Sequence, residues 1–314
     1  MIDTEPDPGL FPFGRPNSTR PSRRVPEAKA MVIGVYPSAF HVSWTAPEYT
    51  WGKGPPRRIK ALAVDVEPVV FWEGGQDEEK RQLEDWLLRV GFQEGDDPGR
   101  HGHIDSTPPP VNGISGREVV HHYLTPLGLR QREVAFTDVF PIYMLKYRGK
   151  GKGRREQGDA IRDDYDPIAP DMGLKQSTLP ARIPSGRLPA AAAAWFGDQL
   201  RRDLQETQPQ LVITLGKEVW ETILLVLGGE ATSPVRAFED LYGDHYGSRG
   251  RLNLGGRPVE WLPLIHPGLI GGAAPVGNLE PQRRTVAGWN DLHTEWVHRA
   301  GAHLVPVMAQ AESQ

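Results

Sequence analysis

Short apolar runs alternate with amphipathic stretches along most of the chain after residue 30. Runs with the length and composition of buried strands occupy residues 30–35, 59–71, 133–140, 211–215 and 259–265. Apolar residues spaced as on one face of a helix occupy residues 76–90, 117–127, 188–204 and 216–227, and recur after residue 278. Strands that alternate with helices form a mostly parallel sheet covered on both faces. The pattern therefore predicts an α/β fold, with three α/β/α layers around a mostly parallel central sheet.

The pattern is absent from three segments. Residues 1–29 hold six prolines and a basic cluster without helical or strand period, so we expect a flexible Pro-rich arm. Residues 146–186 start with a basic, glycine-rich stretch and continue through an acidic one, which predicts a long exposed loop. Residues 304–314 form a tail. We expect residues 30–303 to form a single domain that contains this loop.

Composition restricts the classes of function. The chain has 314 residues, of which 38% are hydrophobic, 35 are glycine and 30 are proline, which suits a globular protein with many loops. The absence of cysteine excludes disulfides and cysteine-bound zinc or iron–sulfur clusters. Two histidine pairs, at 101 with 103 and at 121 with 122, lack a carboxylate spacing that completes a metal site. We therefore expect no metal and no cofactor.

The sequence also indicates where the protein acts. No apolar stretch reaches the ~20 residues that a membrane helix needs, and the acidic, Pro-rich start lacks the features of a signal peptide. We expect a cytoplasmic protein without a membrane partner. The net charge of −4 does not suggest a nucleic-acid-binding protein, although one basic face or loop suffices for phosphate contacts.

Three predicted strands end in short motifs that can carry chemistry. They are G-V-Y-P-S at 34–38, T-D-V-F-P at 137–141 and L-I-H-P-G at 264–268, and a fourth segment, Q-P-Q-L-V-I-T-L-G at 208–216, precedes a helix. Side chains at such exits face any site that an open α/β sheet carries. In this order the segments resemble the uracil-DNA glycosylase superfamily, whose members carry a Gly-x-x-Pro motif, a Thr-Asn strand end, a P-x-V-V-x-x-L-G strand and a His-Pro-Ser motif. The resemblance covers roughly residues 30 to 300.

The resemblance implies a DNA glycosylase-like hydrolase of base-excision repair, which cleaves the N-glycosidic bond of a flipped damaged or modified base, uracil or a related one. It implies that Gly34 and Pro37 form the water-activating loop and that Phe71 stacks on the base. It also implies that Asp138 binds the base edge and that His266 stabilises the leaving base. Such chemistry requires a base held outside the stack and charge stabilised on the departing ring.

Three positions depart from the pattern of the family, and one of them is Gly268, which stands in place of the Ser of the His-Pro-Ser motif. Tyr36 stands where the first motif often supplies Asp or Asn. A phenol is a poor proton acceptor at neutral pH, so we expect Tyr36 to contact the nucleobase rather than to activate water. Asp138 replaces Asn, and an ionised carboxylate only accepts hydrogen bonds, which favours an amino-bearing base unless Asp138 is protonated. A carboxylate can come from a neighbouring strand, where Asp65 and Glu67 lie two residues apart on one face. We therefore predict catalytic roles for His266, Asp65 and Glu67.

Each of these residues also has a structural explanation. His266 before a Pro-Gly turn can bond to the backbone, Asp138 can cap a turn, and the acidic pair can form an exposed strand edge. The alternative function is therefore a catalytically impaired nucleic-acid-binding protein of the same fold. An unrelated nucleotide or sugar hydrolase is a third, although neither G-x-x-x-x-G-K-[ST] nor G-x-G-x-x-G occurs.

Two further segments are expected to contact lesion-bearing DNA, single or double stranded. The basic run supplies a flexible phosphate clamp, unless it is merely a solvated loop; its residues are Lys150, Lys152, Arg154 and Arg155. Leu269 or Ile270, just after the third motif, is the expected wedge that fills the gap left by the flipped base. We expect the protein to act as a monomer.

Overall fold

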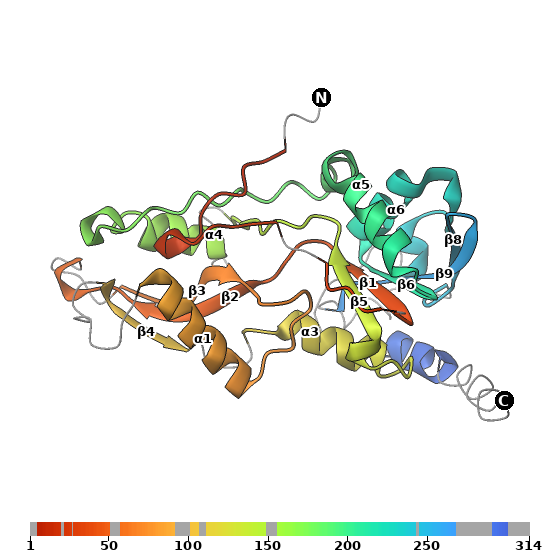
Figure 1. Cartoon of the computed structure of the whole chain (residues 1–314), viewed down its shortest axis with the longest axis horizontal. Coiled ribbons are helices and arrows are strands. Elements are labelled where there is room, and N and C mark those ends of the chain that lie inside the picture. The colour runs from red at the N-terminus through yellow and green to blue at the C-terminus, as the bar shows by residue number, and fades with distance from the viewer. Residues whose placement is uncertain are drawn as a thin grey trace.

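A computed structural model of the protein describes residues 5–19, 22–26, 28–50, 57–91, 101–106, 111–148, 156–242, 245–267 and 291–300. Within these ranges the strands form two sheets (Figure 1). The larger sheet has six strands in the order β5-β1-β6-β9-β8-β7. The smaller one has three strands in the order β3-β2-β4.

The larger sheet is mixed and mostly parallel. Its parallel strands are β1 (Ala30–Gly34), β5 (Val134–Asp138), β6 (Leu211–Leu215) and β9 (Arg257–Leu264). The strands β8 (Gly250–Leu254) and β7 (Ala231–Thr232) continue the sheet antiparallel to β9. All residues of β1 are buried, as in strands that are covered on both faces. The prediction of an α/β fold with a mostly parallel sheet is confirmed.

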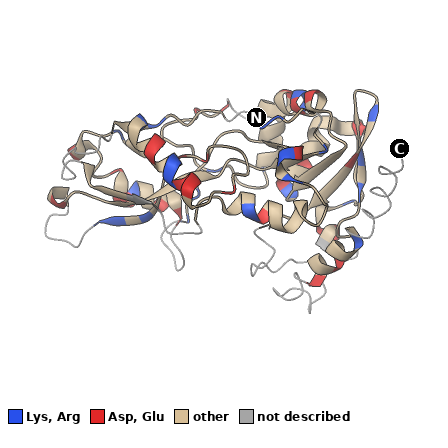
Figure 2. Cartoon of the chain, turned by 60° about the horizontal axis from the view of Figure 1, so that its bottom comes forward, with Lys and Arg blue, Asp and Glu red and all other residues tan. Residues whose placement is uncertain are grey.

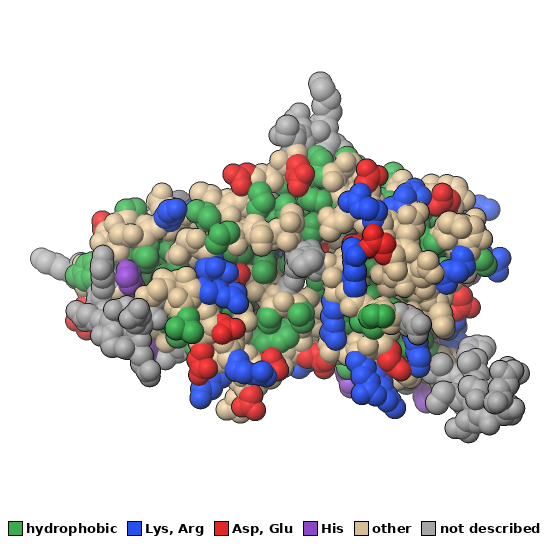
Figure 3. Space-filling model, in the orientation of Figure 1, with side chains coloured by type: hydrophobic (Ala, Val, Ile, Leu, Met, Phe, Trp, Pro, Cys, Tyr) green, Lys and Arg blue, Asp and Glu red, His purple; other side chains and the backbone are tan. Residues whose placement is uncertain are grey.

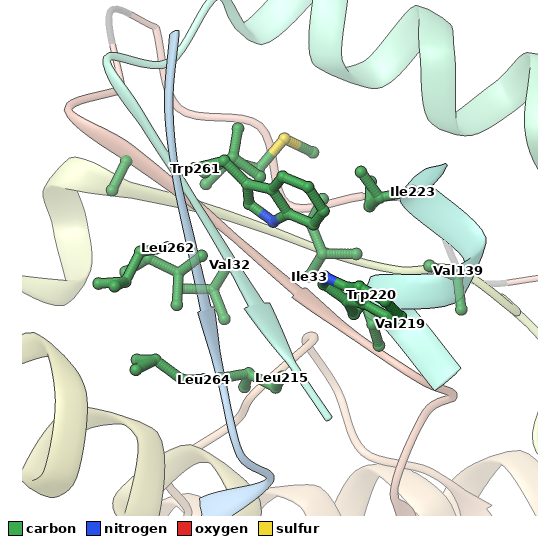
Figure 4. Packing of buried hydrophobic residues seen from close by; sticks show 14 of the residues in the cluster. Val32, Ile33, Val139, Leu215, Val219, Trp220, Ile223, Trp261, Leu262 and Leu264 are labelled. Carbon is green, nitrogen blue, oxygen red and sulfur yellow. The ribbon is translucent and has the colours of Figure 1, made fainter. Parts of the chain in front are cut away.

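Helices lie on both faces of this sheet (Figure 1). One face carries α5 (Leu188–Thr207) and α6 (Lys217–Leu227), and the other carries α3 (Ile114–Val119), its continuation to Leu124 and the helix at 291–300. Figure 4 shows the apolar packing on both faces of β1, β6 and β9: Ile33 and Trp261 lie on the side of α6 with Val219, Trp220 and Ile223, and the other face carries Val32, Leu215, Leu262 and Leu264. This packing fixes the positions of the strand ends, where the motifs lie.

The smaller sheet is antiparallel and lies beside the larger one. Its central strand β2 (Ala39–Thr45) pairs with β3 (Arg58–Val66) and β4 (His103–Ser106), and α1 (Gln76–Val90) buries Trp86 against it. The predicted strand at 59–71 is thus present as β3, but outside the parallel sheet. Parallel neighbours need a crossover connection, whereas strands without an intervening helix can pair antiparallel. Sequence periodicity did not predict β2 or β4.

The N-terminal segment is packed where the structure describes it, in contrast to the flexible arm expected from composition. Phe11 is fully buried and stacks on Tyr143, with ring centroids 5.3 Å apart. The rings of Phe13 and Trp86 pack edge to face, with their centroids 5.3 Å apart. Arg23 exchanges backbone hydrogen bonds of 2.8 and 3.0 Å with Phe136, which covers the outer edge of β5. Isolated aromatic anchors leave no period in a sequence, so composition alone suggested disorder.

The segment 146–186 is also partly packed rather than wholly exposed. It contains α4 (Gln157–Ala160), followed by a turn of π-helix at Ile161–Tyr165 and a 3₁₀ turn at Pro170–Met172. Ile161 and Tyr165 are buried against the smaller sheet. Other 3₁₀ turns lie at Pro12–Gly14, Glu48–Thr50, Gln131–Glu133, Gly228–Glu230 and Phe238–Tyr242. In the described ranges, no helix is both long and apolar enough to cross a membrane.

Candidate active site

A cavity of about 510 Å³ lies at the carboxyl ends of the parallel strands. Its lining includes the last residues of three strands, Gly34 of β1, Asp138 of β5 and Leu215 of β6, and also His266 just beyond β9. The chain passes from β1 to β5 on one side and then to β6 on the other, so the strand order reverses here. In doubly wound sheets this reversal opens the crevice in which ligands bind.

Gly34 brings two of the predicted base-binding side chains together. Gly34 pairs with Asp138 in the register of β1 and β5. A Cβ atom on Gly34 would lie 2.8 Å from Phe71 Cζ and would overlap Asp138 Oδ1. The carboxylate and the ring edge therefore converge over a position that only glycine leaves open.

Phe71 holds an unusual backbone conformation. Its φ is +53°, in the left-handed region that non-glycine residues rarely adopt. Gln131 Nε2 donates a 3.3 Å hydrogen bond to the carbonyl of Phe71, and the Phe71 ring lies 5.6 Å from that of Phe136. Such conformations cost of order 1–3 kcal/mol and cluster at functional sites. The half-exposed ring thus forms one apolar wall of the cavity.

His266 lies across the cavity on the segment that follows β9. The hydroxyl of buried Tyr123 donates a 2.6 Å hydrogen bond to the carbonyl of Ile265, which holds the backbone directly before His266. Desolvation lowers the pKa of His266 to about 4; the positive charge of Lys146 adds to this effect and the carboxylate of Glu218 opposes it. The ring nevertheless keeps solvent-accessible surface at the cavity. At neutral pH it is therefore a neutral imidazole, with one donor and one acceptor nitrogen.

Tyr36 also lines this cavity. The guanidinium carbon of Arg182 lies 4.9 Å from the centroid of the Tyr36 ring. Arg182 Nη2 lies 3.6 Å from Glu218 Oε1 in the first turn of α6. Pro37 is buried beside Tyr36, as expected of a loop that shapes a site.

The two carboxylates predicted from the strand 59–71 are not brought together. Asp65 is buried in β3 and accepts a 3.0 Å hydrogen bond from Arg15 Nε, and it is not among the described residues that line the cavity. Glu67 lies one residue beyond the end of β3 and accepts a 2.8 Å hydrogen bond from the backbone N–H of Gly113. Because β3 ends at Val66, the alternation that put both side chains on one face does not extend to Glu67.

Glu67 lines a second cavity, of about 310 Å³. This cavity shares Tyr36, Pro37, Ser38, Ser115 and Lys146 with the first, so these residues form the wall between the two. Glu67 and His266 thus line two neighbouring cavities that are separated by these shared residues.

Sequence reasoning missed three charged residues of the first cavity. Arg182 comes from an extended segment without period, so nothing local marks it. Lys146 belongs to the basic run, and Glu218 follows Gly216 at the start of a helix, which was a usable signal. The expected DNA contacts Lys150, Lys152, Arg154, Arg155, Leu269 and Ile270 lie outside the described residues.

The arrangement suits a flat polar ring. Phe71 offers an aromatic surface, Asp138 an acceptor, and neutral His266 a donor, while Lys146 and Arg182 add positive charge. In the described ranges, no group of histidine and carboxylate side chains could hold a metal ion. No protein-family model matches the chain, and no curated protein matches its sequence. Geometry and chemistry therefore carry the functional interpretation.

Proposed function

We propose that the protein is a DNA N-glycosidase that hydrolyses the bond between a flipped damaged or modified base and its sugar, on a uracil-DNA glycosylase-like fold. One observation carries the proposal. Six residues singled out from separate stretches of the sequence line one cavity at the strand ends; they are Gly34, Tyr36, Pro37, Phe71, Asp138 and His266. Parallel strands always end at one edge of a sheet, so the support lies in the kinds of side chain that meet there: an aromatic ring, a carboxylate and a histidine.

In the proposed reaction the base stacks on Phe71 and its edge meets Asp138. The N-glycosidic bond breaks and its electron pair leaves with the base, while a water oxygen bonds to the anomeric carbon. The proton that the water loses passes through the orienting carboxylate to the departing base anion. His266 donates a hydrogen bond to the departing base, in the manner of an oxyanion hole, which is worth ~10²-fold or more in rate. The pKa of His266, lowered to about 4, means that the imidazole is neutral at pH 7, so it donates a hydrogen bond to the departing base without transferring a proton to it.

The carboxylate proposed to orient the water is Asp138, which lines this cavity, because Glu67 lines the second cavity and accepts a hydrogen bond from Gly113. Asp65 is a poorer choice because its carboxylate is engaged by Arg15 within β3. A carboxylate near the sugar also stabilises the oxocarbenium-like transition state of glycoside hydrolysis. An ionised Asp138 accepts hydrogen bonds, so the preferred base presents N–H donors on its edge.

The second candidate function is binding of nucleic acid without turnover. It is favoured by Tyr36, whose ring is held by Arg182 at the position where a water-activating group is expected. Lys and Arg are interspersed with Asp and Glu in the views of Figure 2 and Figure 3. Binding of a nucleic-acid strand would therefore depend on charged groups near the cavity rather than on a broad basic face.

The deciding experiment incubates the full chain with labelled oligonucleotides that carry single uracil, deaminated or oxidised bases, in single and double strands. Alkali-labile abasic sites report cleavage. His266→Ala should slow single-turnover cleavage by ~10²-fold or more, whereas His298→Ala, which changes an exposed histidine of the helix at 291–300, should not.

The outcomes separate the two candidates. Binding without cleavage of any base would favour the binding protein. The absence of both binding and cleavage would refute both candidates. Cleavage that survives His266→Ala would refute the proposed mechanism.

A further inference from the structure

Arg182 carries hydrogen-bond donors that the described part of the protein does not use. Its side chain is only 24% exposed. Its guanidinium stacks on Tyr36 and stands 3.6 Å from Glu218, which is beyond hydrogen-bond distance. Within the described residues, Nε is buried without an acceptor. Arginine has five N–H donors and most buried polar groups are paired, so this cation is placed for an acceptor that the described residues do not supply.

Lys146 stands beside Arg182 by virtue of the backbone. The N–H of Leu145 donates to the carbonyl of Pro180 at 2.9 Å, and the N–H of Arg182 donates to the carbonyl of Leu145 at 2.8 Å. These bonds pair Leu145 with Ala181 as in a parallel sheet. The next residues, Lys146 and Arg182, are therefore in register, and both line the cavity.

Two neighbouring cations in a concave site favour an anion. Glu218 faces Arg182 and partly neutralises it, while Asp138 lines the same cavity beside Gly34 and Phe71. The guanidinium fork matches the oxygens of a phosphate in a bidentate manner, and the ammonium adds a point charge. A nucleotide supplies a partner for each group, a base for Phe71 and Asp138 and a phosphate for the two cations.

We propose that Arg182 and Lys146 bind the phosphate of the nucleotide whose base lies at Phe71 and Asp138. The protein then recognises a phosphorylated nucleoside unit rather than a nucleoside. The position of the base rests on the proposed function, but the phosphate site does not. The phosphate is either a diester in a strand or the monoester of a free nucleotide.

The test measures binding to the full chain by calorimetry at fixed ionic strength. The probes are a nucleoside, its 5′-monophosphate and a short single-stranded oligonucleotide, for each common base. Arg182→Gln and Lys146→Gln should each weaken binding of the phosphorylated probes by about 10-fold or more and change nucleoside binding less than about twofold. Arg187→Gln, an exposed change in the same segment, is the matched control and should have no effect.

Tighter binding of the oligonucleotide than of the monophosphate identifies a strand as the source of the phosphate, and the reverse identifies a free nucleotide. In the first case each variant should also reduce the salt dependence of binding by about 0.7 per lost contact. Wild-type affinity in both variants would overturn the proposal. Equal losses for nucleoside and nucleotide would overturn it as well, because Arg182 would then only support the Tyr36 wall. Phosphate binding without cleavage of any base would refute the glycosidase alone.

Discussion

Gly34→Ala tests whether the meeting of Phe71 and Asp138 over β1 forms the base-binding site. The new methyl carbon would lie 2.8 Å from Phe71 Cζ and 3.2 Å from Cε2, and would overlap Asp138 Oδ1. Carbon atoms pack at 3.5–4.0 Å, so the ring must retreat by about 0.7 Å or more, and the carboxylate must rotate away. The strand cannot move instead, because the Gly34 carbonyl accepts a 3.0 Å hydrogen bond from Val139 and β1 is paired on both sides.

Both displaced groups are the ones proposed to hold the base, so binding should suffer along with stability. Overpacking costs about 1–3 kcal/mol of folding free energy, which corresponds to a few degrees in Tm. A comparable loss in the site would reduce affinity by about 10-fold or more, because each 1.4 kcal/mol is tenfold. The assay combines thermal unfolding with titration of the nucleoside or oligonucleotide that binds the wild type most tightly.

Gly229→Ala is the matched control. A Cβ atom there meets nothing within 4 Å, and the residue does not have a positive φ. It makes the same change in the unfolded chain without touching the cavity, so any common effect on chain entropy cancels. Ligand affinity in Gly34→Ala equal to that of the wild type would refute the role of this convergence in binding.

Two further predictions follow from single side chains. Asp138→Asn should shift preference toward uracil, because an amide both donates and accepts; an unchanged ratio of uracil to amino-bearing bases in competition cleavage or binding would contradict this. Burial lowers the pKa of both His41 and His293 from 6.5 to about 4. The unfolded chain then binds protons in this window that the folded protein does not, so the free energy of unfolding should fall as pH falls from 6.5 toward 4, by up to about 1.4 kcal/mol per pH unit and histidine. Urea unfolding of His293→Gln should show a shallower decline than that of exposed His298→Gln; equal slopes would contradict the assignment.

The sequence alone determined the elements of the larger sheet and the order of its motifs. The hydrophobic period and the length of apolar runs depend only on residues that are close together in the sequence. They correctly predicted α1, α5 and α6 as well as β1, β5, β6 and β9. The Pro and Gly residues after the strands marked where each chain segment turns. Because parallel strands in one sheet end at the same edge, these motifs were expected to converge, and the cavity lies at that edge.

Tertiary structure decided which side chains reach the cavity. Asp65 and Glu67 were equivalent by spacing, but the end of β3 at Val66 separates them, and Arg15 from the N-terminal segment engages only the first. Arg182 reaches Tyr36 through the pairing of two segments that are more than thirty residues apart, at Leu145 and Ala181. Neither contact leaves a trace in local periodicity, because each depends on packing between distant segments. The strand ends that line the cavity thus follow from strand patterning, whereas the presence of Arg182 in it follows from long-range contacts.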